Sequence, residues 1–545
     1  MKRLDLLPFS LYNKKKATVC VTFKNFRKLR GSIMKERQSG VLMHISSLPG
    51  KYGIGSMGQA AYDFVDFLER TKQRYWQILP LGTTSYGDSP YQSFSAFAGN
   101  THFIDLDFLI EKGWLTEADL AGIDFGTNDT EVDYAKVFHG RRPVLEKVVQ
   151  AIKAEGLPAD YWSFAEENGF WLHTFAEYMA IKEHFDLKPW TEWEDQGARL
   201  RYHDTLEYYR HLLADQMDYH RITQYLFFSQ WHALKAYANA KGIEFVGDMP
   251  IYIAADSADM WANPHFFKTD GEGKPSVVAG CPPDAFSEIG QLWGNPIYDW
   301  EAMKYDGFTW WVARLRESFK IYDMVRIDHF IGFASFWEIP AGEETAVNGY
   351  RVEAPGFELF ETIKYHLGDL NIIAEDLGTV TDKVIQLRET TGFPGMKVLQ
   401  FAFDPEGDSI EMPHNHRNNV VAYTGTHDND TILGWYEKET TEESRAFLDK
   451  YSNRREDETV SHAMFRLLFG SPAFMAVATM QDLLGLDGSA RMNLPNTLGG
   501  NWTWRMTADQ LTPAIEADLL DLTVTYRREN AIIKAKEQEV TEPSA

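Results

Sequence analysis

Three short apolar runs that end in charged residues constrain the fold of this chain more than any other feature of the sequence. They occupy residues 323–330, 371–378 and 419–430 and carry the acids Asp328, Glu375 and Asp428 at or near their ends. A run of this kind predicts a buried strand whose C-terminal tip delivers polar groups. The acids are 47 and 53 residues apart, which leaves room for helical crossovers. We therefore expect parallel strands in one sheet, with three candidate catalytic acids at their ends.

Further strand-like segments complete a barrel pattern. They lie at 40–47, 75–81, 243–252 and 395–403, with an eighth between Ala473 and Arg491. Helical stretches separate most of them, including an amphipathic segment at 60–69. The pattern predicts an α/β protein, a (β/α)8 TIM barrel whose active residues gather at the C-terminal ends of the strands.

The domain organisation follows from where this pattern is interrupted. Residues 34–107 form the first part of the predicted barrel, 108–235 a mostly helical insertion between strands 2 and 3, and 236–540 the remainder with loop subdomains and no separate C-terminal β domain. Residues 1–33 carry nine lysines and arginines against one acid, Asp5. We interpret them as a disordered basic tail, translated from upstream of a start at Met34.

Charge and composition exclude several classes of partner. The net charge of −25 argues against nucleic acid and anionic membranes and favours a neutral substrate. No apolar run of about 18 residues is present to span a membrane. Cys20 and Cys281 are the two cysteines, so a reducing cytoplasm is the expected compartment. Cys281 is isolated and His414 and His416 fall in a predicted surface loop, so we expect neither a metal site nor a cofactor.

Two aromatic loops accompany the barrel pattern, at 83–100 and 279–296. Both are rich in Gly, Pro and Ser as well as in aromatic residues, so they are neither regular strands nor plain linkers. Long loops inside a compact domain usually serve function. Aromatic residues in such loops are candidates for stacking on sugar faces.

The acids at the strand ends match the needs of glycoside cleavage, in which one carboxyl group protonates the leaving oxygen and another attacks or stabilises the oxocarbenium-like centre. Asp328 is the better nucleophile, because Arg326 points to the same face of the strand and favours the ionised carboxylate. Glu375 is the better acid, because the apolar run before it and a neighbouring anion raise its pKa. Asp428 is placed to bind sugar hydroxyls and to strengthen that grip in the transition state.

Six short motifs of the chain resemble those of a known family. From about Gly40 to Arg505 the chain closely resembles the 4-α-glucanotransferases, or amylomaltases, of glycoside hydrolase family 77 in the α-amylase clan. The motifs that carry the resemblance are Ser85–Ser93 (SYGDSPYQS), Gly247–Tyr252 (GDMPIY), Arg326–His329 (RIDH), Ala374–Gly378 (AEDLG), Thr426–Asp430 (THDND) and Gly500–Trp502 (GNW). One departure is Asn496, where a glycine is more usual; both residues tolerate turns.

The resemblance implies roles for individual residues. Asp328 matches the nucleophile of the family, Glu375 its acid/base and Asp428 its transition-state stabiliser. Tyr91 matches an aromatic residue that stacks on the sugar, and Glu288 and Trp293 match a loop over the cleft. Polar contacts to sugar hydroxyls or to the nucleophile are implied for Asp248, Arg326, His427 and Asn501.

Three functions are compatible with these residues. The first is a retaining transferase that moves α-1,4-glucan segments between maltooligosaccharides through a covalent glucosyl-enzyme. The second is an α-1,4-glucan hydrolase with the same carboxylates, and the third is a glycan-binding protein without catalysis. The catalytic acids alone do not separate transfer from hydrolysis, and the sequence leaves the oligomeric state open.

Overall fold

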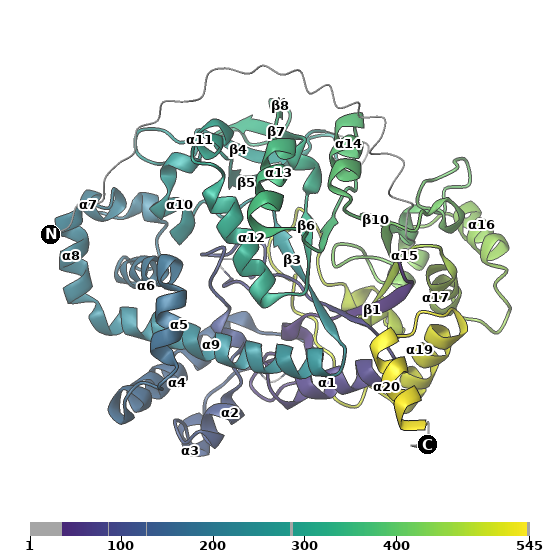
Figure 1. Cartoon of the computed structure of the whole chain (residues 1–545), viewed down its shortest axis with the longest axis horizontal. Helices are drawn as coiled ribbons and strands as arrows, with labels where there is room; N and C mark the ends of the chain where they lie inside the picture. The colour runs from purple at the N-terminus through teal and green to yellow at the C-terminus, as the bar shows by residue number, and fades with distance from the viewer. Residues whose placement is uncertain (1–34, 85–86, 127, 284–286, 542–545) are drawn as a thin grey trace, which may run out of the picture. The chain divides into compact units, whose positions relative to one another are not determined.

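The centre of the molecule is a parallel sheet of eight strands (Figure 1). The computed structural model describes residues 35–84, 87–126, 128–283 and 287–541; the expected tail at 1–33 lies outside them. The strands are β1 (Gln38–Leu42), β2 (Tyr75–Gln77), β3 (Glu244–Pro250), β6 (Met324–Asp328), β9 (Ile372–Ala374), β10 (Gly395–Val398), β11 (Val420–Tyr423) and β12 (Met475–Thr479).

The order of these strands confirms the predicted barrel. The strands pair in parallel in the order β10-β11-β12-β1-β2-β3-β6-β9. Neighbours in this order are successive barrel strands along the chain, and the last strand, β12, pairs with the first, β1. The backbone N–H of Ala374 donates to the carbonyl of Pro394 at 2.9 Å, which joins β9 to the residue before β10. The ring of strands is thereby nearly closed, as a (β/α)8 barrel requires.

Side chains alternate along the strands between the barrel interior and the surrounding helices. Val246, Met324, Ile373 and Val421 belong to the interior cluster of buried apolar side chains. Their strand neighbours, such as Val325, pack outward into the larger core beneath the helices. Because the alternation has a period of two, the residues two positions beyond the interior apolar ones point to the same face and form a polar layer at the C-terminal end.

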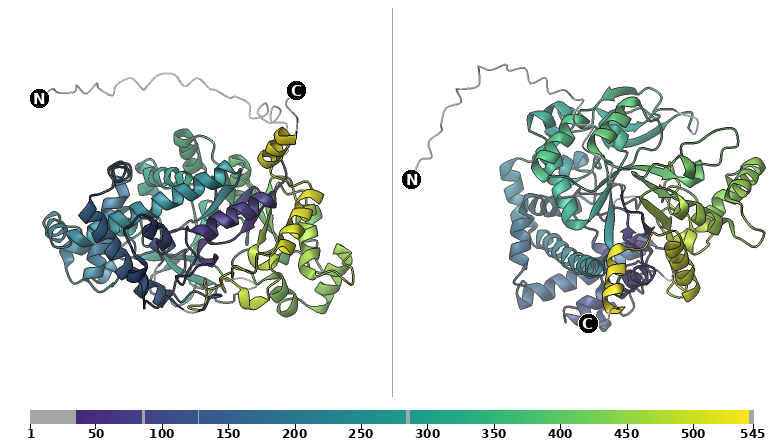
Figure 2. Two further views of the ribbon diagram at one scale, coloured as in Figure 1. Left: turned by 90° about the horizontal axis from the view of Figure 1, so that it is seen from below. Right: turned by 45° about the vertical axis from the view of Figure 1, so that its right-hand side comes forward.

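Helices surround this sheet and fill the connection between β2 and β3. Around the sheet lie α1 (Gln59–Arg70), α12 (Thr309–Ile321), α13 (Gly356–Leu367), α14 (Asp382–Thr391), α15 (Ile432–Lys438), α16 (Glu442–Ser452), α17 (Val460–Gly470), α18 (Met480–Leu483), α19 (Pro513–Thr525) and α20 (Ala531–Thr541). The β2–β3 connection holds α2 (Leu106–Glu111), α3 (Glu117–Leu120), α4 (Tyr134–Glu155), α5 (Tyr161–Glu167), α6 (Gly169–His184), α7 (Gln196–Arg199), α8 (His203–Leu212) and α9 (Ala214–Ala240). The blue helices of this connection lie together on one side of the barrel strands in each view (Figure 2).

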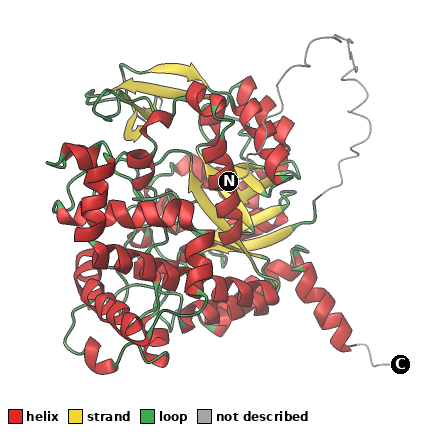
Figure 3. Cartoon of the chain, turned by 60° about the vertical axis from the view of Figure 1, so that its left-hand side comes forward, coloured by secondary structure: helices red, strands yellow, loops and turns green. Residues whose placement is uncertain are grey.

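A second, antiparallel sheet corrects one expectation from the sequence. It contains β4 (Val277–Cys281), β5 (Gln291–Pro296), β7 (Ser335–Pro340) and β8 (Tyr350–Glu353) in the order β5-β4-β7-β8. The segment 279–296, predicted as an aromatic loop, thus supplies two strands of a hairpin, because β7 pairs with β4 and completes its hydrogen bonds. Figure 3 shows the two sheets as separate groups of yellow strands. The remaining helices, α10 (Ala258–Ala262) and α11 (Trp300–Tyr305), precede and follow the β4–β5 hairpin in the chain.

Two smaller expectations also change. The strand predicted at 395–403 ends at Val398, where a 3-10 helix begins. His416, expected at the surface, is buried, and its Nε2 atom hydrogen-bonds with the carbonyl oxygen of Glu411 at 2.9 Å. Within the described residues, no helix is long and apolar enough to cross a membrane.

Candidate active site

The polar layer inside the barrel is organised by Arg326. Its Nη1 atom donates to both carboxylate oxygens of Asp248 at 2.7 Å, and its Nη2 atom lies 2.9 Å from Oδ1 of Asp328. Burial alone disfavours the charged guanidinium, but the two carboxylates outweigh it and raise the pKa of Arg326 well above its ordinary value. Arg326 therefore stays charged and holds Asp328 at the tip of β6, where 31 % of the Asp328 side chain is exposed.

Glu375 follows β9 directly and has a different environment. The backbone N–H groups of His329 and Leu377 donate to its two oxygens, at 2.7 and 2.8 Å. Burial, and secondly the negative charge of Asp328, raise the pKa of Glu375 to about 8, although Arg326 and the two N–H groups act in the opposite direction. Glu375 therefore keeps its proton at neutral pH.

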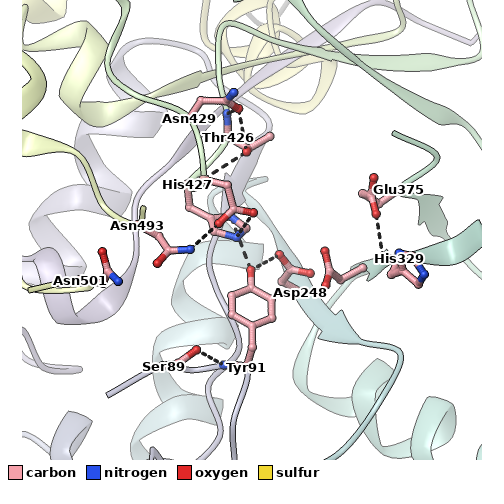
Figure 4. Close-up of polar contacts among 12 residues, drawn as sticks. Ser89, Tyr91, Asp248, His329, Glu375, Thr426, His427, Asn429, Asn493 and Asn501 are labelled. Carbon is pink, nitrogen blue, oxygen red and sulfur yellow. Dashed lines mark hydrogen bonds and ion pairs between the residues drawn. The ribbon is translucent and has the colours of Figure 1, made fainter. Parts of the chain in front are cut away.

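The backbone of His329 links these two carboxyl groups. His329 comes directly after Asp328 and adopts a left-handed conformation, with φ 55° and ψ 44°. This conformation is strained for a residue other than glycine. It accompanies the hydrogen bond from the His329 N–H to Glu375, so the turn after Asp328 also fixes Glu375 (Figure 4).

Asp428 lies in a turn beyond β11, which ends at Tyr423. The side-chain amide of Asn493 donates to its Oδ1 at 2.7 Å, and His427 Nε2 lies 3.3 Å from its Oδ2. Nη2 of Arg491 donates to the backbone carbonyl of Asp428 at 2.6 Å. The carboxylate is 42 % exposed, so it is held in place and still open to a ligand.

Tyr91 lies between Asp248 and His427 and contacts both (Figure 4). Its hydroxyl donates to Oδ2 of Asp248 at 2.8 Å and lies 3.5 Å from Nδ1 of His427. Its ring stacks on the imidazole of His427, with centroids 5.1 Å apart and planes 21° apart. The predicted residues Tyr91, Asp248, Arg326 and His427 thus form a cluster of hydrogen bonds and ion pairs with Asp328 and Asp428. Glu375 adjoins this cluster through its bond to the backbone of His329, the residue after Asp328.

The remaining predicted residues are farther from this cluster. Trp293 lies in β5 rather than in a loop, and its ring meets the imidazole of His329 edge to face at 4.8 Å. Asn501 accepts the N–H of Leu494 at 2.9 Å and bonds Thr497, so it supports the loop next to Asn493 without touching the acids. Glu288 is exposed in a turn, and among the described residues no hydrogen bond or ion pair joins it to the cluster. Ser85, Tyr86 and 284–286 lie outside the described residues.

Two contacts at this site could not be predicted from the sequence. Asn493 is separated from Asp428 by 65 residues, and nothing in its local pattern indicates the contact. The motif that contains His329 was recognised, but its backbone N–H donor depends on a left-handed turn that sequence periodicity does not reveal. Asn496, the departure from the usual glycine, has a φ of 64°, which an asparagine tolerates.

The arrangement defines a class of enzyme. A buried carboxylic acid that keeps its proton and a carboxylate paired with an arginine follow two adjacent barrel strands, β9 and β6, at their C-terminal ends, which is the constellation that glycosyl transfer requires. In the described part of the chain, no group of three His, Cys, Asp or Glu side chains is placed to hold a metal ion. The fold and the site are those of an α/β-barrel enzyme acting on glycosidic bonds.

Comparison with known proteins identifies the family. The family model described as 4-alpha-glucanotransferase matches residues 43–512. A 4-alpha-glucanotransferase of Streptococcus pneumoniae is 67 % identical over 497 residues, which cover 91 % of this chain and 98 % of that protein. A Thermus thermophilus 4-alpha-glucanotransferase is 46 % identical over 487 residues, 88 % of this chain and 96 % of the relative. The chain belongs to the 4-α-glucanotransferase family.

A solved structure agrees with this assignment. The amylomaltase of Streptococcus agalactiae, solved in complex with acarbose, superposes with a TM-score of 0.89 and 49 % identity. The match covers 91 % of this chain and all of that one. The likeness therefore extends over the barrel and the insertion rather than over isolated motifs.

Proposed function

We propose that this enzyme transfers α-1,4-glucan segments between maltooligosaccharides by a double displacement in which three carboxyl groups have separate roles. Asp328 is the nucleophile, Glu375 the acid and base, and Asp428 the stabiliser of the transition state. The observation that carries this assignment is the contrast between Glu375, whose pKa is raised to about 8, and Asp328, whose carboxylate is paired with Arg326 at 2.9 Å.

In the first step a carboxylate oxygen of Asp328 attacks C1 of the donor glucose. The glycosidic bond breaks, and the proton of Glu375 passes to the leaving oxygen, so that the displaced chain departs as a neutral alcohol. The product is a glucosyl ester on Asp328 and an ionised Glu375. Arg326 holds the attacking carboxylate in position throughout this step.

In the second step the same groups work in reverse. Esterification removes the negative charge of Asp328, which is one of the causes of the raised pKa of Glu375. The pKa of Glu375 then falls, so Glu375 is suited to act as a base. It takes the proton of the acceptor hydroxyl while that oxygen attacks C1 and releases Asp328. The two displacements together retain the configuration at C1.

The other cluster residues bind and orient the sugar. Asp428 accepts hydrogen bonds from sugar hydroxyl groups. Its carboxylate is held in place by Asn493, whose Nδ2 donates to Asp428 Oδ1 at 2.7 Å. Tyr91 and His427 form an aromatic and polar wall beside the cleft, tied to Asp248 by the Tyr91 hydroxyl. Trp293, Glu288 and Asn501 are assigned to the outer part of the cleft by resemblance, Trp293 with the added support of its contact to His329.

The compartment and the ligands complete the proposal. Donors and acceptors are maltooligosaccharides and longer α-1,4-glucans, which are neutral and suit an acidic protein with a net charge of −25. A cytoplasmic location is supported by the two cysteines, Cys20 and Cys281, which provide no disulfide framework. Cell fractionation with an antibody against the chain tests the location.

Incubation with maltotriose tests the function directly. A transferase produces glucose together with maltopentaose and longer oligomers, with no net rise in reducing ends. A hydrolase shortens the substrate while reducing ends accumulate, and a binding protein leaves the maltotriose unchanged. We expect the first result; either of the others would refute the proposed function.

A further inference from the structure

The ring of barrel strands has a seam between β9 and β10. These two strands are the ends of the eight-stranded sheet, and among the described residues no strand pairing joins them. One backbone hydrogen bond crosses the seam, from the N–H of Ala374 to the carbonyl of Pro394 at 2.9 Å. Glu375 follows β9 and therefore lies at a place where regular strand pairing does not fix the backbone.

The carboxylate of Asp376, the residue after Glu375, spans this seam. Its Oδ1 accepts the backbone N–H of Met396 in β10 at 2.8 Å, and its Oδ2 accepts a hydrogen bond from Nη1 of Arg388 on α14 at 2.7 Å. The Asp376 side chain is 5 % exposed and that of Arg388 is 20 % exposed. A buried side chain thus supplies the cross-strand bond that backbone pairing supplies elsewhere in the barrel.

Gly395 leaves room for this ion pair. A Cβ atom at that position would lie less than 3.0 Å from Nη1 of Arg388 and from both carboxylate oxygens of Asp376. A larger residue would therefore push the pair away from the start of β10. The pair is fitted into the seam and differs in this from a surface ion pair, whose side chains move freely.

Glu375 is held between β6 and this anchor. On the β6 side its N–H donates to the carbonyl of Ile327 at 3.1 Å, and its carbonyl accepts the N–H of Phe330 at 3.0 Å. On the β10 side the hold comes from Asp376. The N–H of Leu377, directly after Asp376, donates to Oε1 of the Glu375 side chain at 2.8 Å. Moving Asp376 would therefore displace both the backbone of Glu375 and a donor to its carboxyl group.

The environment of the Glu375 carboxyl group explains why its position matters. Burial is the largest cause of its raised pKa of about 8. The charged groups that act on it come from β6, where Asp328 raises the pKa and Arg326 lowers it. β10 contributes the neutral side chain of Met396, whose sulfur accepts a hydrogen bond from Nε of Arg326 at 3.3 Å. Water that enters through a loosened seam would therefore reduce the burial and lower the pKa of Glu375.

We propose that Asp376, held by Arg388, is a positioning residue that keeps Glu375 in its buried place for proton transfer. The proposal rests on the role of Glu375 as acid and base in the proposed function. Asp376 directs one carboxylate oxygen to Met396 and the other to Arg388, so it acts on the reaction through Glu375 rather than by touching the sugar.

Two substitutions at Asp376 test this role. Asp376→Ala removes the anchor, whereas Asp376→Asn keeps an acceptor oxygen for the N–H of Met396. Both variants lose the same charge, so a difference between them reports position. We expect Asp376→Ala to lower kcat for maltotriose by about tenfold or more and to move the alkaline fall in kcat/KM from about pH 8 to about pH 7. Asp376→Asn should show less than about half of either change.

Two further measurements separate the acid from general damage to the protein. The first turnover of α-maltotriosyl fluoride needs no acid, so Asp376→Ala should release fluoride within about threefold of the wild-type rate. Glu458→Ala is the matched control, because Glu458 is 2 % exposed and pairs with Arg466 on α17, which is 27 % exposed. This control should lower the melting temperature but leave the alkaline fall at about pH 8.

Arg388→Gln takes the place of Asp376→Ala if that variant does not fold. Loss of the Arg388 cation by itself would raise the pKa of Glu375, because the charge of Asp376 would no longer be balanced. A shift of the alkaline fall to lower pH in Arg388→Gln would therefore still report a loosened seam. An unchanged or higher pH for this fall would overturn the proposal.

The contrary results for Asp376 are equally definite. An alkaline fall at the same pH in Asp376→Ala and the wild type would overturn the positioning role. Equal shifts in the Ala and Asn variants would assign the effect to charge and would also overturn it, as would a fluoride release that falls as strongly as maltotriose turnover.

Failure of the wild type to convert maltotriose would instead refute the proposed function. The pH dependence of unfolding, measured with and without Glu375→Gln, then still decides whether Asp376 keeps Glu375 buried. In the Asp376→Ala background the difference in unfolding free energy should level off near about pH 7 rather than about pH 8. A difference that keeps rising to about pH 8 in that background would overturn the proposal.

Discussion

Replacing Glu375 by glutamine should increase the stability of the folded protein relative to the wild type as pH rises. Glutamine has the size of the protonated carboxyl group and carries no charge, but its NH₂ group cannot accept the hydrogen bond from His329 or Leu377 that one Glu375 oxygen accepts, which costs a constant amount of stability at every pH. In the wild-type enzyme, ionisation of Glu375 lowers the stability of the folded state, because this carboxyl group is buried beside Asp328. The same environment keeps the group protonated for catalysis. The substitution removes this pH-dependent loss of stability together with the activity.

The size of the effect follows from the two pKa values of Glu375. The ordinary value of 4.5 applies to the unfolded chain, and the folded value is about 8. Since the folded state binds the proton more tightly, the contribution of Glu375 to stability is fully present below pH 4.5 and is lost as pH rises towards 8. At about 1.4 kcal/mol per pKa unit, the wild type loses less than about 1 kcal/mol at pH 5 and about 3 kcal/mol at pH 7. The free energy of unfolding of Glu375→Gln, relative to that of the wild type, should therefore rise by about 2 kcal/mol from pH 5 to pH 7.

Urea unfolding of the two proteins at pH 5, 6, 7 and 8 measures this rise. Asp428→Asn is the control, because its carboxylate is 42 % exposed and removing it relieves little burial cost. The difference between Glu375→Gln and the wild type should widen steadily up to pH 8, while the difference for Asp428→Asn changes less. A constant difference for Glu375→Gln across this range would refute the raised pKa and the reasoning that assigns Glu375 as the acid.

Three further predictions concern activity. The kcat/KM for maltotriose should fall as pH rises past about 8, where Glu375 loses its proton; a rate that stays level to pH 10 would contradict this. Asp328→Ala should lose several orders of magnitude in kcat with an unchanged circular dichroism spectrum, and a tenth of wild-type activity would exclude Asp328 as the nucleophile. Asn493→Ala should lower kcat by about tenfold to hundredfold, because Asp428 loses its 2.7 Å donor, whereas Thr497→Ala in the same loop should have a smaller effect; equal rates for the two would remove Asn493 from the site.

The barrel could be predicted because its strands carry a strong local signal. Met324, Arg326 and Asp328 point inward while Val325 and Ile327 point outward, so the apolar run and the polar tip follow from strand periodicity alone. The same periodicity places Asp248 and Arg326 on the interior face of adjacent strands, where they form their ion pair. Asp328 lies beside both of them, because Arg326 Nη2 is 2.9 Å from its carboxylate.

The features that were missed depend on contacts between distant segments. Val277–Cys281 becomes a strand only because Ser335–Pro340 pairs with it, and its Gly and Pro context gives no local signal. His416 was predicted to lie at the surface, but it is buried and forms a hydrogen bond with the carbonyl oxygen of Glu411. The contact between Asn493 and Asp428 likewise exists only once the loops after β11 and β12 meet.

The central claim, that Asp328 forms a covalent bond to the donor sugar, can be tested by trapping that intermediate. Glu375→Gln protein incubated with α-maltotriosyl fluoride needs no acid for the first step, because fluoride leaves unaided, but it lacks the base for the second. The ester should accumulate, and mass spectrometry of the digested protein should find a maltotriosyl group on the peptide that contains Asp328. A sugar attached to another carboxylate, or no adduct while fluoride is still released, would contradict the account.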